Sequence, residues 1–173
     1  PGLGQSPWSL ALAQRACASG KPLVLDADAL NLLAMRRIEP GGECLLTPHP
    51  GEAARLLGTT TDDIARDRFA AVRALAEQFD AVVVLKGAGS LIADVDGAVR
   101  LCPYGNPGMA SGGMGDALTG VVAALWAQGR PCFDAAHVGV LVHALAGDRA
   151  ARAGERGLLA SDLIAELRAV VNP

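Results

Sequence analysis

Residues 106–119 read NPGMASGGMGDALT, a glycine-rich loop that runs into an apolar helical pattern. Its glycines permit φ > 0 and a close approach of the backbone to a ligand: Gly108, Gly112, Gly113 and Gly115. A glycine-rich turn that opens a helix suits an anion, because unpaired N–H groups and the helix dipole both favour negative charge. Asp116 follows in the first turn, where its carboxylate can take a proton from a hydroxyl that attacks a phosphate, or help hold a metal. The alternative is a plain turn in which Asp116 only caps its helix.

Strand and helix patterns alternate along the chain outside this loop, which favours an α/β fold with a largely parallel sheet. Apolar runs predict strands at residues 22–26, 44–47 and 81–85, and a hairpin of residues 90–93 and 99–102. Apolar periodicity predicts helices at residues 6–19, 28–34, 50–57, 61–79, 116–128 and 133–153, and a last helix capped by Ser161 or Asp162. Because the sequence contains no repeat or linker, we expect residues 1–173 to form a single domain.

Composition argues against several classes of protein. Hydrophobic residues make up 51% of the 173 residues and aromatic residues 3%, which suits helices packed closely on a parallel sheet. The net charge of −3 and the absence of a Lys/Arg run argue against a nucleic-acid partner. No apolar run approaches the roughly 18 residues of a membrane span. Four scattered cysteines without a C-x-x-C pair predict reduced structural thiols in a cytoplasmic protein, with neither a disulfide frame nor a zinc site.

Ionisable side chains mixed with glycine or proline follow each predicted parallel strand, at the edge where such sheets bind ligands. The stretch LDADALN at residues 25–31 follows the first strand. Asp26 can face the ligand crevice there, or hold a water on Mg²⁺. Asp28 is well explained as a helix cap, and Asn31 is ambiguous in the same way.

The stretches TPHPGE at residues 47–52 and LKGAGS at residues 85–90 follow the next two strands. Prolines on both sides of His49 fix the backbone and suggest an aimed side chain, although most histidines are structural. Lys86 can reach a phosphate as a point charge, and the alternative is a tight turn with a solvated lysine. The sequence has no Walker motif and no G-x-G-x-x-G that opens a strand–helix–strand unit. A P-loop NTPase is therefore excluded, and a Rossmann dinucleotide site is poorly supported.

Five stretches, taken in order, resemble the ADP/ATP-dependent NAD(P)H-hydrate dehydratase family of the ribokinase-like superfamily: PGLGQ, LDADALN, TPHPGE, LKGAGS and NPGMASGGMGD. The resemblance implies a ribokinase-like α/β fold, with a largely parallel sheet flanked by helices on both faces. It also implies an enzyme that repairs the (6S)-hydrates of NADH and NADPH. In that reaction ADP, or ATP, phosphorylates the hydrate hydroxyl and phosphate is then eliminated, so that ADP becomes AMP.

The resemblance assigns roles to individual residues. Asp116 is the implied general base on the hydrate hydroxyl. Substrate contacts are implied for Gly4, His49, Asn106 and Asp116. Nucleotide contacts are implied for Lys86, Gly87, Ala88, Gly89, Ser90 and Gly115. Mg²⁺ is the implied cofactor, and it bridges the phosphates with few direct protein ligands, none of which is assigned to a residue of this chain.

Two departures from the family pattern stand out. The first motif of the family commonly reads Gly-Pro-Gly-Leu-Gly, whereas this sequence starts at the proline. We therefore expect a fragment that lacks its N-terminal strands, exposes a sheet edge and is unstable alone. The loop reads MASGGMGD where a Thr-Ala or Ser-Gly pair is common, a change that we expect to be tolerated. The resemblance also implies a homo-oligomer, with a tetramer as one candidate, and it leaves open an epimerase domain fused upstream.

Two other functions remain open at the level of sequence. The first is a small-molecule kinase of the same superfamily, acting on a hydroxymethyl group of a vitamin precursor or a sugar. It would share the G-x-G-D base and the anion loop, whereas TPHPGE and LDADALN favour the dehydratase. The second is a nucleotide-binding module without catalysis, which would bind AMP or ADP and turn nothing over.

Overall fold

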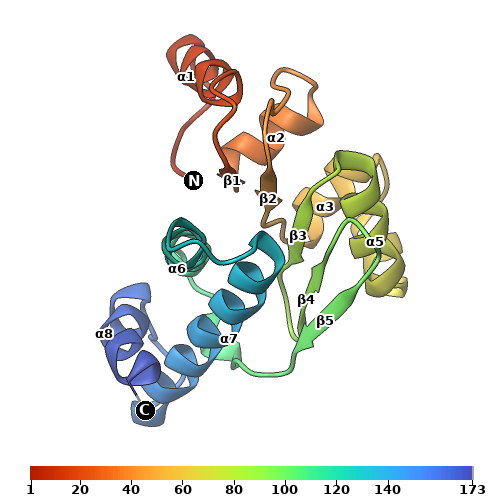
Figure 1. Cartoon of the computed structure of the whole chain (residues 1–173). Helices are drawn as coiled ribbons and strands as arrows, with labels where there is room; N and C mark the ends of the chain where they lie inside the picture. The colour runs from red at the N-terminus through yellow and green to blue at the C-terminus, as the bar shows by residue number, and fades with distance from the viewer. Residues whose placement is uncertain (173) are drawn as a thin grey trace. The chain divides into compact units, whose positions relative to one another are not determined.

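The structure, a computed structural model, describes residues 1–172 and consists of two compact units (Figure 1). The first unit comprises Pro1–Gly87 and Leu91–Arg100, and the second comprises Ala88–Ser90 and Leu101–Pro173. That residues 1–173 form a single domain stays a prediction.

A five-stranded sheet with the order β1-β2-β3-β4-β5 lies mainly in the first unit. Its strands are β1 (Leu23–Leu25), β2 (Cys44–Leu46), β3 (Val82–Leu85), β4 (Ser90–Ala93) and β5 (Val99–Cys102). Strand β2 pairs in parallel with both β1 and β3, while β4 pairs antiparallel with β3. Strands β4 and β5 form the predicted hairpin, and a backbone hydrogen bond from Asp94 N to Ala98 O at 2.9 Å closes its turn. The largely parallel sheet and its strand positions are thereby confirmed.

The helices of the first unit flank this sheet (Figure 1). They are α1 (Pro7–Cys17), α2 (Asp28–Ala34), α3 (Pro50–Leu57), α4 (Thr61–Arg66) and α5 (Arg68–Phe79). Their apolar faces and the strands share one core, whose most enclosed members include Leu46, Val83, Leu85, Val72 and Leu75. Pro50 opens α3 and Gly58 ends it with φ 65°, as the positions of these residues predict.

The single helix predicted for residues 61–79 is wrong, because the chain breaks at Asp67. This residue has φ −147° and ψ 87°, and its side chain accepts a hydrogen bond from Ala70 N at 2.9 Å. The carboxylate therefore caps a new helix, α5. Thr60 caps α4, in place of the predicted Thr61 or Asp62.

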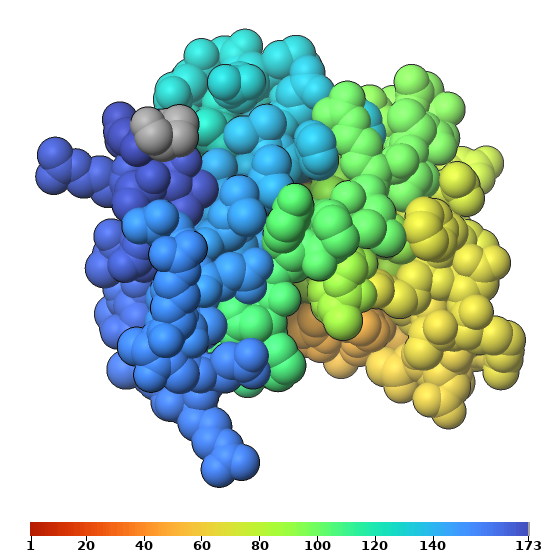
Figure 2. All heavy atoms as spheres, turned by 90° about the horizontal axis from the view of Figure 1, so that it is seen from below, coloured from red at the N-terminus to blue at the C-terminus, as the bar shows by residue number. Residues whose placement is uncertain are grey.

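The second unit is helical apart from its connecting loops. It contains η1 (Pro107–Met109), α6 (Met114–Ala127), α7 (Cys132–Ala150), η2 (Ala151–Ala153) and α8 (Ala160–Val171). Helix α7 packs side by side with α8, and both belong to the blue part of the molecule (Figures 1 and 2). Helix α6 also packs on α7. Met114, Ala146, Leu158 and Leu163 form a small core between these elements.

Two helix starts in this unit differ from the prediction. Helix α6 begins at Met114, two residues before the predicted Asp116, because Gly113 takes a left-handed conformation with φ 87° and starts the helix. Helix α8 begins at Ala160, and Asp162 accepts from Leu159 N at 2.9 Å from inside the first turn. In both cases an Asp that resembles a cap in sequence lies at the third helical position. No helix within residues 1–172 is long and apolar enough to cross a membrane.

Candidate active site

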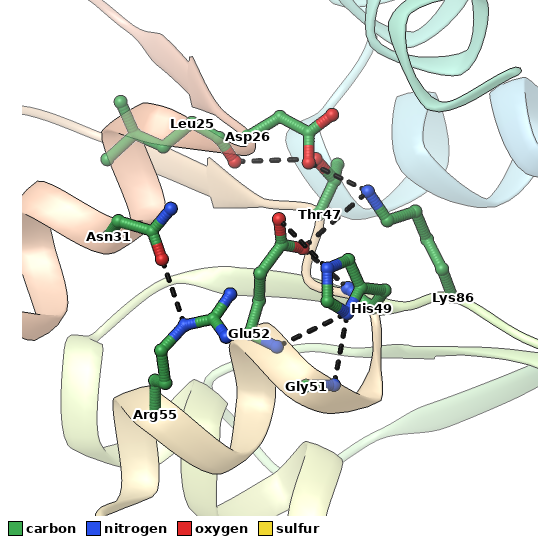
Figure 3. Close-up of polar contacts among 9 residues, drawn as sticks. All are labelled: Leu25, Asp26, Asn31, Thr47, His49, Gly51, Glu52, Arg55 and Lys86. Carbon is green, nitrogen blue, oxygen red and sulfur yellow. Dashed lines mark hydrogen bonds and ion pairs between the residues drawn. The ribbon is translucent and has the colours of Figure 1, made fainter. Parts of the chain in front are cut away.

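Three neighbouring strands of the first unit end in polar side chains that meet at one edge of the sheet. Asp26 follows β1, Thr47 follows β2 and Lys86 follows β3. Parallel strands place their carboxyl ends at the same edge, so these side chains gather although they lie far apart in sequence. The Lys86 Nζ lies 2.8 Å from Asp26 Oδ1 and 3.8 Å from Glu52 Oε2 (Figure 3).

This cluster is largely enclosed by protein. The Asp26 and Glu52 side chains are 2% and 5% exposed, and the Lys86 side chain is 20% exposed. Burial by itself raises the pKa of the Asp26 carboxyl. The hydrogen bond and positive charge of Lys86, helped by Thr47 and the backbone of Ala27, outweigh burial and lower that pKa below its usual value. Asp26 is therefore an anion at neutral pH, held by the ammonium group of Lys86.

His49 lies at the start of α3 and uses both ring nitrogens within the protein (Figure 3). Its Nδ1 accepts from Gly51 N at 3.0 Å and from Glu52 N at 3.3 Å. The carboxylate of Glu52 accepts from His49 N at 2.8 Å and lies 3.3 Å from Nε2. The two side chains thus form a reciprocal cap, and the proton of a neutral ring sits on Nε2, facing Glu52. Half of the His49 side chain stays exposed. The spacing of His49 and Glu52, three residues apart, was the signal for this cap.

The other candidate residues of LDADALN make bonds within the protein. Asp28 accepts from Gly4 N at 2.8 Å, so its carboxylate holds the PGLGQ turn, in which Gly4 has φ 74°. Asn31 accepts from Arg55 Nε at 2.9 Å. The residue between the two aspartates, Ala27, has φ 49° and ψ −114°, a conformation that costs about 1–3 kcal/mol for a non-glycine residue. Nothing in the sequence predicts strain at an alanine.

The LKGAGS stretch turns sharply after β3. Lys86 N donates to Pro48 O at 2.8 Å, and Gly87 adopts φ 143°. Arg68 donates to Leu85 O at 3.3 Å, and its guanidinium would lie 3.1 Å from a Cβ placed on Gly87. A side chain at Gly87 would therefore displace Arg68. Sequence reasoning missed Arg68, because its partners are backbone carbonyls that no motif encodes.

In the second unit the glycine-rich loop leads directly into α6. The first N–H groups of any helix, here including that of Gly115, have no intrahelical partner, and Gly113 has no side chain to cap them. Asp116 lies in the first turn with an exposed side chain, where the helix dipole favours its negative charge. The amide nitrogen of Asn106 donates to Asp148 Oδ1 at 3.0 Å. The loop thus offers backbone donors and one exposed carboxylate, the groups needed to hold an anion and accept a proton.

The structure brings the candidate residues together in two sets. Asp26, His49, Glu52 and Lys86 gather in the first unit, and Asn106, Gly115 and Asp116 lie on the loop and helix start of the second. Across residues 1–172, no three His, Cys, Asp or Glu side chains are grouped so that they could hold a metal ion.

Comparisons with known proteins agree with one another. The sequence model of the NAD(P)H-hydrate dehydratase family matches residues 1–169. The bifunctional NAD(P)H-hydrate repair enzyme of Coxiella burnetii is 51% identical over 174 residues, covering 100% of this chain and 36% of the relative. The ADP-dependent (S)-NAD(P)H-hydrate dehydratase of Neisseria meningitidis is 49% identical over 133 residues, covering 74% of this chain and 45% of the relative.

A solved structure extends the comparison to three dimensions. The ADP/ATP-dependent NAD(P)H-hydrate dehydratase of Bacillus subtilis, co-crystallised with ATP and Mg²⁺, superposes with a TM-score of 0.89 at 32% identity. The match covers 99% of this chain and 62% of that one. The chain thus spans about a third of the bifunctional relative, at 36%, and less than two thirds of the solved structure. On the family match over residues 1–169 and the identity of about one half to curated members, the chain belongs to the NAD(P)H-hydrate dehydratase family.

Proposed function

We propose that the protein containing this chain dehydrates the (6S)-hydrates of NADH and NADPH at the expense of ADP or ATP. The observation that carries the proposal is the exposed carboxylate of Asp116 in the first turn of α6, directly after the glycine-rich loop. A base and an anion-binding helix start are the two parts that phosphorylation of a hydroxyl requires. The family membership supports this reaction.

The chemistry follows from the leaving group. Hydroxide leaves a carbon poorly, and phosphate leaves well. Asp116 would accept the proton of the hydrate hydroxyl while that oxygen forms a bond to the terminal phosphorus of ADP. The bond from that phosphorus to the bridging oxygen breaks, and AMP is released. Loss of phosphate and of a ring proton then restores the dihydronicotinamide. The N–H groups at Gly115 and in the loop would stabilise the transferring phosphoryl group.

The other residues bind and orient. The stretch Lys86–Ser90 would contact the nucleotide, and Gly4 and His49 would contact the hydrate. Mg²⁺ bound to the phosphates would neutralise their charge during transfer. The buried carboxylates Asp26 and Glu52 suit hydrogen bonds to the waters of such an ion, because the single charge of Lys86 leaves the three groups with a net negative charge. Their burial leaves little room for direct ligation.

The test uses the natural full-length polypeptide that contains this sequence. The protein is incubated with hydrated NADH, Mg²⁺ and ADP, and three products are measured: dihydronicotinamide absorbance, AMP and inorganic phosphate. Equal amounts of all three support the dehydratase. A phosphorylated product that retains its phosphate would instead indicate a small-molecule kinase. Nucleotide binding without any product would indicate a non-catalytic module.

The setting of the enzyme is part of the same proposal. We place it in the cytoplasm, where the damaged cofactors are formed and where the thiols of Cys17, Cys44, Cys102 and Cys132 stay reduced. The protein would form a homo-oligomer. The same polypeptide would also carry a second activity, as in the bifunctional relatives. Sedimentation of the full-length protein tests the oligomeric state, and the full-length sequence tests the fused activity.

A further inference from the structure

Helix α7 contacts the glycine-rich loop from its beginning to its end. At the beginning, the carboxylate of Asp148 accepts from Gly105 N at 3.1 Å and from Asn106 Nδ2 at 3.0 Å. At the end, His143 Nε2 lies 2.9 Å from Met114 O, the first carbonyl of α6. His143 is buried, so this bond is shielded from water. Two side chains of a single helix therefore hold both ends of the loop.

The middle of the loop packs on the same helix. Met109 lies against Gly147, so closely that a Cβ placed on Gly147 would overlap the Met109 sulfur. Gly147 adjoins Asp148 in sequence and lies one helical turn after His143. Because Gly147 has no side chain, it leaves the space that Met109 fills. The loop thus contacts α7 at its start, middle and end. Its shape is set by α7 as well as by its own glycines.

The side chain of Asn106 is turned inward by this arrangement. Its amide nitrogen faces Asp148, and its Oδ1 is buried without a hydrogen-bond partner among the described residues. That oxygen would lie 3.0 Å from a Cβ placed on Gly108. Rotating the amide by half a turn would place the carbonyl against the Asp148 carboxylate, which repels it. The carboxylate thus sets the orientation of Asn106, at the cost of an unpaired carbonyl.

We propose that Asp148 is a positioning residue for the reaction, acting through Asn106 and Gly105 on the glycine-rich loop that precedes Asp116. Asn106 is then an inner brace of the loop and has no direct contact with the hydrate, contrary to the expectation from the family resemblance. The proposal rests on the proposed function for its catalytic readout. The order of the loop gives a second readout that needs no turnover.

The test is an exchange of the two side chains. In Asp148→Ala, the side chain that accepts from both Gly105 N and Asn106 Nδ2 is removed. In Asn106→Asp, two carboxylates face each other. The double variant Asn106→Asp/Asp148→Asn restores both hydrogen bonds with the donor and acceptor of the pair reversed. Glu166→Gln is the matched control, since it removes the negative charge of the group that accepts from Arg149 on α7 at 2.8 Å and touches no part of the loop.

Both single variants are expected to lower kcat by about 10-fold to 100-fold, because a shift of about 1 Å in a reacting group has an effect of this size. The KM for ADP should change less than kcat. Amide hydrogen exchange of residues 105–114, measured without substrate, should quicken in both. The double variant should recover at least half of the lost kcat on a logarithmic scale and slow the exchange again. The control should match the parent protein in both readouts.

Two results would overturn the proposal. If Asp148→Ala leaves kcat and hydrogen exchange of the loop unchanged, Asp148 does not position the loop. If the double variant restores slow exchange but leaves the KM for the hydrate raised, Asn106 contacts the substrate itself. A parent protein that shows no dehydration contradicts the proposed function alone, because the exchange measurements still decide whether Asp148 orders the loop.

Discussion

The ammonium group of Lys86 donates to the carboxylate of Asp26 at 2.8 Å and joins the end of β3 to the end of β1, across β2. The pair connects residues 60 positions apart in sequence. Glu52, from α3, lies on the other side of the ammonium at 3.8 Å. One lysine thus lies between two buried carboxylates and is the counter-ion of the nearer one, Asp26. This relationship leads to two predictions about stability.

Removing the charge of Lys86 should lower the stability of the protein more than removing the charge of Asp26. Lys86→Met leaves Asp26 buried without its counter-ion, which is expected to lower the free energy of unfolding by about 3–5 kcal/mol. Asp26→Asn leaves the partly exposed ammonium close to Glu52, and we expect a loss of about 1–3 kcal/mol. Urea unfolding at pH 7 measures both. Equal losses, or a larger loss for Asp26→Asn, would contradict the charge balance described above.

The same pair should make stability depend on pH in a defined direction. Lys86 holds the pKa of Asp26 below its ordinary value of 3.8, so the stabilisation is complete above that value and is lost as pH falls through the lowered pKa. The difference in unfolding free energy between the parent protein and Asp26→Asn should stay constant from pH 7 to about 5 and shrink below about 4. Unfolding curves along this pH series measure the difference. A difference that grows on acidification would show that the pKa of Asp26 is raised.

His49 allows a separation of capping from substrate contact. His49→Ala removes the acceptor for two backbone N–H groups and should lower stability by about 1 kcal/mol. His49→Asn keeps a good capping side chain and should retain most of that stability. If the exposed part of the ring touches the hydrate, both variants raise the KM for it. Thermal unfolding and steady-state kinetics on the same samples separate the two roles, and an equal loss of stability in both variants would exclude the cap.

The thiol of Cys44 should react slowly in the folded protein. Burial raises the pKa of Cys44 to about 11, and the neighbouring Cys17 and Glu43 add to the effect. Compared with an ordinary thiol of pKa 9.0, roughly one hundredth as much thiolate is present at pH 8. Labelling with a maleimide, followed by mass spectrometry, should leave Cys44 unmodified until denaturant is added. Fast labelling under native conditions would show that the thiol is exposed.

Local chemistry made much of the fold predictable. The bounds of α3 follow from Pro50 and Gly58, because a proline at the first helical position and a left-handed glycine at the end each act within one turn. The break between α4 and α5 was not predictable in the same way. The apolar stripe continues through Asp67, and the sequence does not reveal that the next residue, Arg68, reaches the carbonyl of Leu85.

The candidate site also has a part that could be predicted from the sequence and a part that could not. The glycine loop and the strand-end charges are visible in the sequence, since each is a short stretch with distinct chemistry. Their partners are not visible: the pairing of Lys86 with Asp26 and of Asn106 with Asp148 depends on how distant segments pack. The sequence predicts Asp116 as the start of α6, because an Asp before an apolar run is typical of a cap. The left-handed Gly113 starts the helix two residues earlier.

The measurement that tests the central claim most directly compares Asp116→Asn with the parent full-length protein. Both are given hydrated NADH, Mg²⁺ and ADP at saturation, and the affinity for ADP is measured separately on the same samples. We expect recovery of dihydronicotinamide by the parent protein and a loss of kcat of about 100-fold or more in the variant, as for removal of a general base. The affinity for ADP should stay within a few-fold. Undiminished recovery by Asp116→Asn, or no recovery by a folded parent protein that binds ADP, would contradict the account.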